Sequence, residues 1–291
     1  MKKFSAVLAI LGLLTYVDSS HAAQKDASSE QIQPVVPERL LDDTHMNEEL
    51  GINEFTAPSI KKIFEDLEGL PAIPEGSILR ARPARLPMDR CSLALQLGGM
   101  MADGFVIVQC GKMNEVKPIA LELSNYAKAL GAGERVNRHA ASLLKNAEDG
   151  DLVNFKNNLA MIQSDVEDEL ASLRDSDMAN LIGLGGWIRA LDAATAALCA
   201  KFSEEKAKVI FQPDVPDYFR YVLDGVSPEM KERRDVSSIM AHLRLLEEQM
   251  TLQKGKMPTL QNVEALRHTT AAMMKVALGD AGVKKLPSSA L

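Results

Sequence analysis

Residues 95–110, with the sequence LQLGGMMADGFVIVQC, are nearly all apolar and include three glycines. A phosphate loop, a membrane span and a buried helix are the three structures to compare. A phosphate loop requires G-x-x-x-x-G-K-[ST] after a strand, and these glycines lack the lysine, the hydroxyl residue and the spacing. A bilayer span requires about 20 apolar residues, but Gln96, Asp103 and Gln109 interrupt this run. The stretch therefore predicts a buried helix.

The polar residues and glycines of this stretch indicate how such a helix would pack. Gln96 and Asp103 are seven residues apart, so they share one thin polar stripe on a helix that is apolar elsewhere. A helix that is apolar almost all round lies in the middle of a bundle. Each glycine costs a helix about 1 kcal/mol relative to alanine. We therefore expect Gly98, with Ala102 four residues on, to lie where another backbone approaches closely.

A second stretch, IGLGGWIRALDAATAAL at 182–198, repeats the Leu-Gly-Gly sequence. It is either a weak internal repeat or a second central helix with the same packing requirement, and we favour the second. Trp187, directly after the glycines, is expected to be buried between helices. Arg189 is expected to pair with Asp103 across the two helices, although Asp192, three residues away, competes for it. Buried pairs of this kind more often fix helix register than carry out chemistry.

The rest of the chain after residue 58 also has sequence patterns that are typical of helices. Aromatic residues make up only 4% of the chain and methionine is frequent, which suits helices better than a β-sandwich. Apolar stripes, caps and glycine stops predict helices over residues 59–70, 89–110, 114–130, 134–147, 152–173, 176–201, 228–253 and 260–278. The predicted fold is all-α: an up-and-down bundle of about five helices within residues 88–202, followed by a C-terminal helical extension over 203–291.

Residues 1–22 have the pattern of a cleaved signal peptide. Lys2 and Lys3 precede an apolar run from Phe4 to Val17 and a small-residue cleavage site at Ser20–Ala23. An uncleaved anchor is the alternative, but the run is shorter than the roughly 20 residues that span a bilayer. No cysteine directly follows the run, so lipid attachment is not expected. We expect a periplasmic or secreted protein with no membrane span after cleavage.

Residues 23–58 read as a flexible polar linker. An acidic group within it, Asp42, Asp43, His45, Glu48 and Glu49, could gather a divalent metal. A solvated acidic linker is the favoured interpretation, because metal sites usually recruit ligands from ordered elements. No metal site and no cofactor are therefore predicted.

Residues 59–87 form a short helix and a loop rich in proline and arginine. Arg80, Arg82, Arg85 and Arg90 make this the most basic part of the mature chain. Guanidinium groups suit carboxylates and phosphates, so these residues are candidate anion contacts. The alternative, which we favour, is that they pair with acidic helices nearby.

Four aromatic residues gather in a short segment after the predicted bundle. Phe211, Tyr218, Phe219 and Tyr221 are candidate ligand contacts, because the cores of helical bundles can hold ligands. Aromatic and methionine side chains are more often ordinary core residues.

The three cysteines allow at most one disulfide. Cys91 and Cys110 lie on one predicted helix and are nearly 30 Å apart at about 1.5 Å per residue, too far to bond. Cys110 and Cys199 end two helices that run parallel in an up-and-down bundle, so they are expected at the same end. A Cys110–Cys199 bond is possible in an exported protein; three buried, reduced cysteines are the favoured alternative.

No catalytic motif is present in the sequence. H-E-x-x-H, G-x-S-x-G and C-x-x-C-H are absent, and the histidines are scattered. A net charge of −7 disfavours general binding to nucleic acid. The sequence therefore predicts a non-catalytic helical binding or interaction protein of the bacterial cell envelope, whose partner is an unidentified envelope protein. The alternative is a carrier of an apolar small molecule, with a pocket between helices.

Overall fold

Helices are the only regular secondary structure in residues 59–81, 85–173 and 175–279, the part of the chain that the computed structural model describes. The described residues all belong to one compact unit of the chain. The all-α class is therefore confirmed. The α-helices are α2 (Ile60–Leu67), α3 (Glu75–Ile78), α4 (Arg90–Gln109), α5 (Val116–Leu130), α6 (Gly133–Glu148), α7 (Leu152–Ser172), α8 (Ser176–Ala200), α9 (Glu204–Ala207), α10 (Asp214–Gly225), α11 (Pro228–Lys231), α12 (Arg234–Met250) and α13 (Leu260–Leu278). Two short 3₁₀ helices, η2 (Met113–Glu115) and η3 (Lys208–Ile210), connect them.

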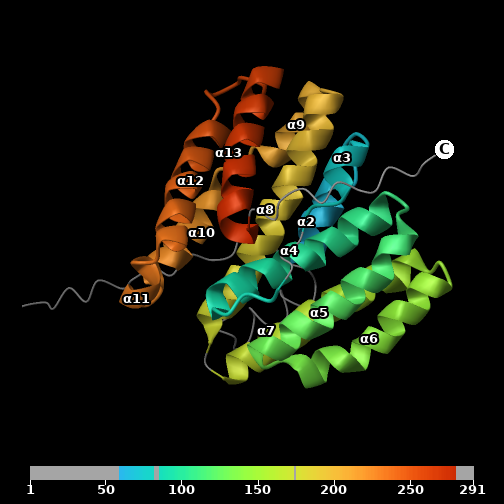
Figure 1. The fold of residues 1–291 in the computed structure, drawn as a ribbon. Coiled ribbons are helices and arrows are strands. Elements are labelled where there is room, and N and C mark those ends of the chain that lie inside the picture. The colour runs from blue at the N-terminus through green and yellow to red at the C-terminus, as the bar shows by residue number, and fades with distance from the viewer. Residues whose placement is uncertain (1–58, 82–84, 174, 280–291) are drawn as a thin grey trace, which may run out of the picture. The chain divides into compact units, whose positions relative to one another are not determined.

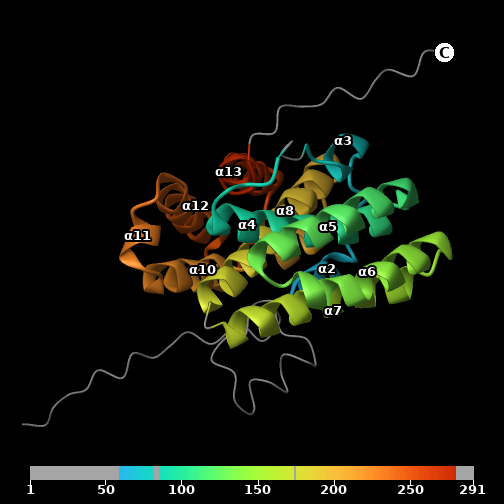
Figure 2. The same ribbon diagram turned by 60° about the horizontal axis from the view of Figure 1, so that its bottom comes forward.

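Helices α4 and α8 form the centre of the fold, and the other helices surround them (Figure 1). On one side, α5 packs on α4, α7 packs on both central helices, and α6 lies outside α5 and α7. On the other side, α13 packs on α8 and α4, α12 packs on α13, and α10 packs on α12 and α8 (Figure 2). Because α4 and α8 are apolar nearly all round, they need this cover on both sides to bury their surfaces.

Glycines let the backbones of α4 and α8 touch where they cross. A Cβ atom added to Gly98 would lie 1.8 Å from the carbonyl oxygen of Ile182, and one added to Gly185 would lie 2.1 Å from that of Leu95. Any side chain at either position would therefore force the helices apart. This crossing explains the repeated Leu-Gly-Gly sequence as a shared packing requirement.

The two central helices run in the same direction. Leu95 lies against Gly185, and Asp103 further along α4 reaches Arg189 further along α8. Near the ends of both helices, Gln109 lines the same small hollow as Ala197. The connecting helices α5, α6 and α7 therefore return the chain to the end at which α4 began.

The C-terminal helices differ from the predicted extension, because they complete the core. Val263, Leu266 and Met273 of α13 are fully buried, and α13 contacts both central helices. The predicted helix over 228–253 is also interrupted. Its residue Arg233 has extended backbone (ψ 135°) and separates α11 from α12. The five-helix bundle is thus an incomplete description of the fold.

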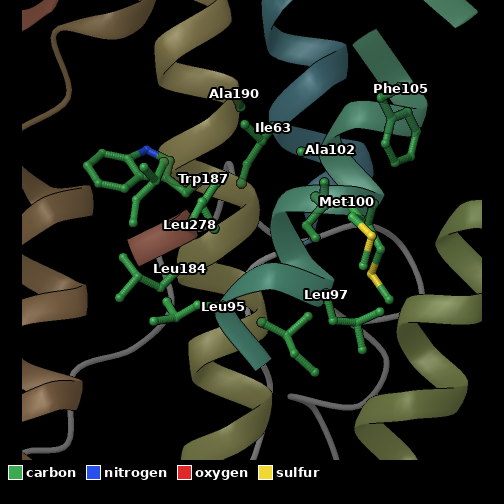
Figure 3. Close-up of a cluster of buried hydrophobic side chains, with 14 of the residues drawn as sticks. Ile63, Leu95, Leu97, Met100, Ala102, Phe105, Leu184, Trp187, Ala190 and Leu278 are labelled. Carbon is green, nitrogen blue, oxygen red and sulfur yellow. The ribbon is translucent and has the colours of Figure 1, made fainter. Parts of the chain in front are cut away.

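Helix α2 is an integral part of the core. Ser59 caps it by accepting a hydrogen bond from the backbone N–H of Lys62, and its apolar stripe faces α4, α7 and α8. The ring of Phe64 stacks on that of Phe105 with centroids 5.3 Å apart. Figure 3 shows side chains from α2, α4, α8 and α13 in one apolar cluster. Residues 59–87 therefore contribute to the same core as the helices that follow.

Candidate functional site

A buried ion cluster lies beside the crossing of α4 and α8, with Asp103 at its centre. The carboxylate accepts a hydrogen bond from Nε of Arg189 at 2.7 Å on one oxygen and from Nε of Arg80 at 2.7 Å on the other. The Asp103 side chain is only 4% exposed and that of Arg189 is fully buried. The structure therefore brings together Asp103 and Arg189, and it adds Arg80, which the sequence did not suggest as a partner of either.

The guanidinium of Arg189 is held on every side. Nη1 donates to Asp192 at 2.9 Å, while Nη2 donates to the carbonyl oxygens of Ser77 and Ile78 at 3.0 and 2.8 Å. Burial alone would lower the pKa of Arg189, but Asp103 and Asp192 outweigh it and raise the pKa above its usual value. The two aspartates do not compete for this arginine, since its planar group donates to both.

Arg80 contacts two side chains of α4 and connects the cluster, through Gln96, to the end of α13. Its Nη1 donates to Gln96 at 3.2 Å, and Gln96 in turn donates to the carbonyl oxygen of Leu278. A Cβ atom on Gly99 would lie 3.2 Å from Nη2 of Arg80, so this glycine leaves room for the guanidinium. That Nη2 is buried without a hydrogen-bond partner among the described residues.

The ion cluster has the properties of a structural element that fixes the helices relative to one another. Two arginines and two aspartates balance in charge, and both oxygens of Asp103 are already engaged by arginines. Its carboxylate is therefore not available as a general base or as a metal ligand. Across the described part of the chain, no group of three or more His, Cys, Asp or Glu side chains could hold a metal ion.

The three candidate anion-contact arginines that the structure describes do not form one site. Arg80 is occupied by Asp103, and Arg90 pairs with Asp175 at 2.6 Å. Arg85 is exposed, and Arg82 lies outside the described residues. For Arg80 and Arg90, pairing with acidic side chains is the arrangement found.

The aromatic segment contributes residues to the core. Phe219 is 1% exposed, and its ring lies 5.5 Å from that of Trp187 between centroids. Tyr218 packs edge-on against Phe219. Phe211 is partly buried against the core, and Tyr221 is largely exposed. The four residues therefore point into different surroundings, and the predicted burial of Trp187 is confirmed at 6% exposure.

Tyr218 also joins a second buried polar group. Its hydroxyl donates to Asn180 at 3.4 Å, and burial together with nearby Glu167 raises its pKa. Glu167 accepts a hydrogen bond from Gln163, which also accepts one from the backbone N–H of Ile60. These contacts connect α2, α7, α8 and α10. The hydroxyl of Tyr218 is thus kept protonated in a structural position.

A hollow beside Trp187 is the nearest feature to the predicted inter-helix pocket. It measures 30 Å³ and is lined by Ile63, Asp66, Leu67, Trp187, Leu191, Val209, Ile210, Gln212 and Met250. One water needs roughly 10–15 Å³. The hollow therefore has room for a few waters but not for a small-molecule ligand of ordinary size.

All three cysteines are free in the structure, so the Cys110–Cys199 bond is not formed. The parallel course of α4 and α8 does bring both residues to the ends of their helices. However, the charges that act on the Cys199 thiol are Arg267 and Glu264 of α13, whereas those that act on the Cys110 thiol are Arg189, Glu75 and Lys112. The two thiols face different neighbours. Burial raises the pKa of each of the three thiols, which disfavours the reactive thiolate.

Helices α4 and α8 are long and apolar enough to cross a membrane by length and composition. In the structure, 94% of the apolar window of each helix is buried inside the protein, as expected for central helices of a core. The parallel course adds a topological argument. If both helices crossed one bilayer, the charged amphipathic segment between them would have to cross back, which is costly.

A surface groove lies where α2 ends, α4 ends and α7 begins. We call it the α7 groove; it measures 370 Å³ and is lined by Glu68, Val108, Gln109, Leu152, Val153 and Lys156. Val153 is 70% exposed and Leu152 is 39% exposed, although both are aliphatic. Lys156 and Glu68 form an ion pair of 2.9 Å at its edge. Sequence reasoning missed this site, because Leu152 belongs to the regular apolar pattern of α7.

Comparison with known proteins adds no further assignment: the chain matches no family model, no curated protein and no solved structure. Three predictions fall on residues 1–58, outside the described residues: the signal peptide, the linker, and the acidic group from Asp42 to Glu49.

Proposed function

We propose that this protein is an exported, non-catalytic interaction protein of the bacterial cell envelope, and that it binds a partner protein through the α7 groove. The observation that carries the proposal is the exposure of Leu152 and Val153 at a hollowed part of the surface. Aliphatic side chains exposed together beside polar ones are typical of protein contact sites.

The interior of the protein favours surface binding over the alternative of a small-molecule carrier. The charged groups near the core are paired with one another, and the hollow beside Trp187 has a volume of only 30 Å³. Ligand pockets are commonly about 300–1,000 Å³. The proposed export rests on the pattern of residues 1–22.

Site-specific photo-crosslinking tests the proposal. A photoreactive amino acid at position 153 is compared with the same amino acid at Leu121, which is 54% exposed on α5 and serves as the matched control. We expect a discrete adduct with another envelope protein from position 153 alone. Adducts of equal yield at both positions, or none, would count against partner binding at this groove. A small-molecule mass retained in native mass spectrometry would favour the carrier instead.

A further inference from the structure

The charges beside the α7 groove indicate which kind of partner it fits; this inference rests on the proposed function. The turn that connects α6 to α7, residues 148–151, reads EDGD and carries three carboxylates and no basic residue. Glu148 and Asp149 are exposed. Asp151 directly precedes Leu152 and Val153, which line the groove, so the EDGD turn leads into the groove along the chain.

The three carboxylates of the turn outnumber the basic side chains that are near them in the sequence. Lys156, the one basic residue that lines the groove, is already paired with Glu68. The carboxylate of Asp151 accepts hydrogen bonds from the backbone N–H and the side-chain amide of Asn154, at 3.0 and 2.6 Å. These bonds lower the pKa of Asp151, so it stays charged in mildly acidic solution. Lys145, exposed in the last turn of α6, lies three and four residues before Glu148 and Asp149 and offsets one of the three negative charges.

We infer that the α7 groove binds a basic amphipathic segment of a partner protein, in which one or two aliphatic side chains are flanked by lysine or arginine. The aliphatic residues would cover Leu152, Val153 and Val108, and the flanking cations would face the EDGD turn. Charge complementarity of this kind speeds association and rejects acidic partners. The same negative charge disfavours anionic lipid and nucleic acid at this surface.

Binding of short labelled peptides to the full chain, followed by fluorescence anisotropy, tests the inference. The probe is a peptide with two leucines flanked by lysines. One comparison peptide has glutamates in place of the lysines, and another has alanines in place of the leucines. We expect only the lysine–leucine peptide to bind, and more weakly as salt is added. Replacing Leu152 and Val153 by serine should weaken it about tenfold, because apolar contact area is lost.

Two further variants separate the groove from the rest of the surface. Asp149→Lys, which reverses one charge of the turn, should weaken binding several-fold, whereas the control Leu121→Ser on α5 should not change it. Circular dichroism checks that each variant is folded. The inference is overturned if the glutamate peptide binds equally well, if the serine variant binds normally, or if the lysine–leucine peptide does not bind. Crosslinking from position 153 to a partner without a basic segment would overturn it while leaving the proposed function intact.

Discussion

Replacement of Asp103 by leucine is the most informative perturbation of the fold. It would leave Arg189 with a single carboxylate, Asp192, and would leave Arg80 with none; both arginine side chains are at least nine-tenths buried. Breaking a buried pair by removing one partner costs about 3–5 kcal/mol. Since Asp103 pairs with two arginines, we expect the free energy of unfolding to decrease by an amount at the upper end of that range.

Urea denaturation of the single, double and triple variants measures this coupling. Arg189→Met alone should cost about 3–5 kcal/mol. The double variant Asp103→Leu, Arg189→Met should lose less stability than the sum of the two single losses. In the double variant neither residue leaves the other as a buried charge without its partner. Adding Arg80→Met should recover more, since Arg80 is the remaining unpaired cation. The control Asp192→Asn, whose side chain is 23% exposed, should cost about 1 kcal/mol or less. Additive losses for Asp103 and Arg189 would refute the reasoning.

Four other measurements check the remaining features. Gly98→Ala should destabilise the protein by about 1–3 kcal/mol or more, because its Cβ would lie 1.8 Å from a carbonyl oxygen of Ile182; the control Gly76→Ala has open space and should cost nothing in the same urea assay. Trp187 should fluoresce at short wavelength and resist quenching by iodide; a spectrum like that of free tryptophan would contradict its burial. Thiol counting on the denatured, unreduced protein should find three free thiols, and a count of one would restore the disulfide. Burial acts to raise the pKa of Asp235, but hydrogen bonds from Arg233 and the backbone outweigh it and lower the pKa. Asp235 therefore adds stability above the unfolded-state pKa, and this stability is lost as pH falls through the folded-state pKa. Asp235→Asn should make the free energy of unfolding fall less steeply in acid, and an unchanged pH dependence would exclude the contribution.

The sequence predicts the central helices well, because their patterns are local and strong. The glycines at 98 and 185 mark a close backbone crossing that a residue with a side chain would prevent. Asp103 on one helix and Arg189 on the other suggest an ion pair between the two. The apolar stripe of α2 likewise predicts which of its residues are buried. Helix starts follow from their caps, as at Asp89 and Thr259, whose side chains accept hydrogen bonds from the first turn.

The parts that the sequence does not predict depend on contacts distant in the chain. Arg80 looks like a member of an exposed basic loop, and only the tertiary structure places it against Asp103 under the end of α13. The apolar stripe of α13 predicts that the helix buries one face, but it does not predict which helices cover that face. The sequence is therefore equally compatible with a separate C-terminal extension and with a helix that completes the core. The α7 groove is formed by three helix ends, and no single segment carries its pattern.

The parallel course of α4 and α8 has a consequence for how the chain acquires its structure. Helix α4 is complete at Gln109, but its main partner begins only at Ser176. At about 5–20 residues per second, synthesis of the intervening chain takes roughly 3–13 s. Throughout that interval a 20-residue apolar helix lacks its main partner and is covered only by the short helices α2 and α3 and the amphipathic helices α5 to α7. The nascent chain is therefore most prone to aggregation before α8 emerges, and a chaperone that shields α4 during this interval would raise the yield of folded protein.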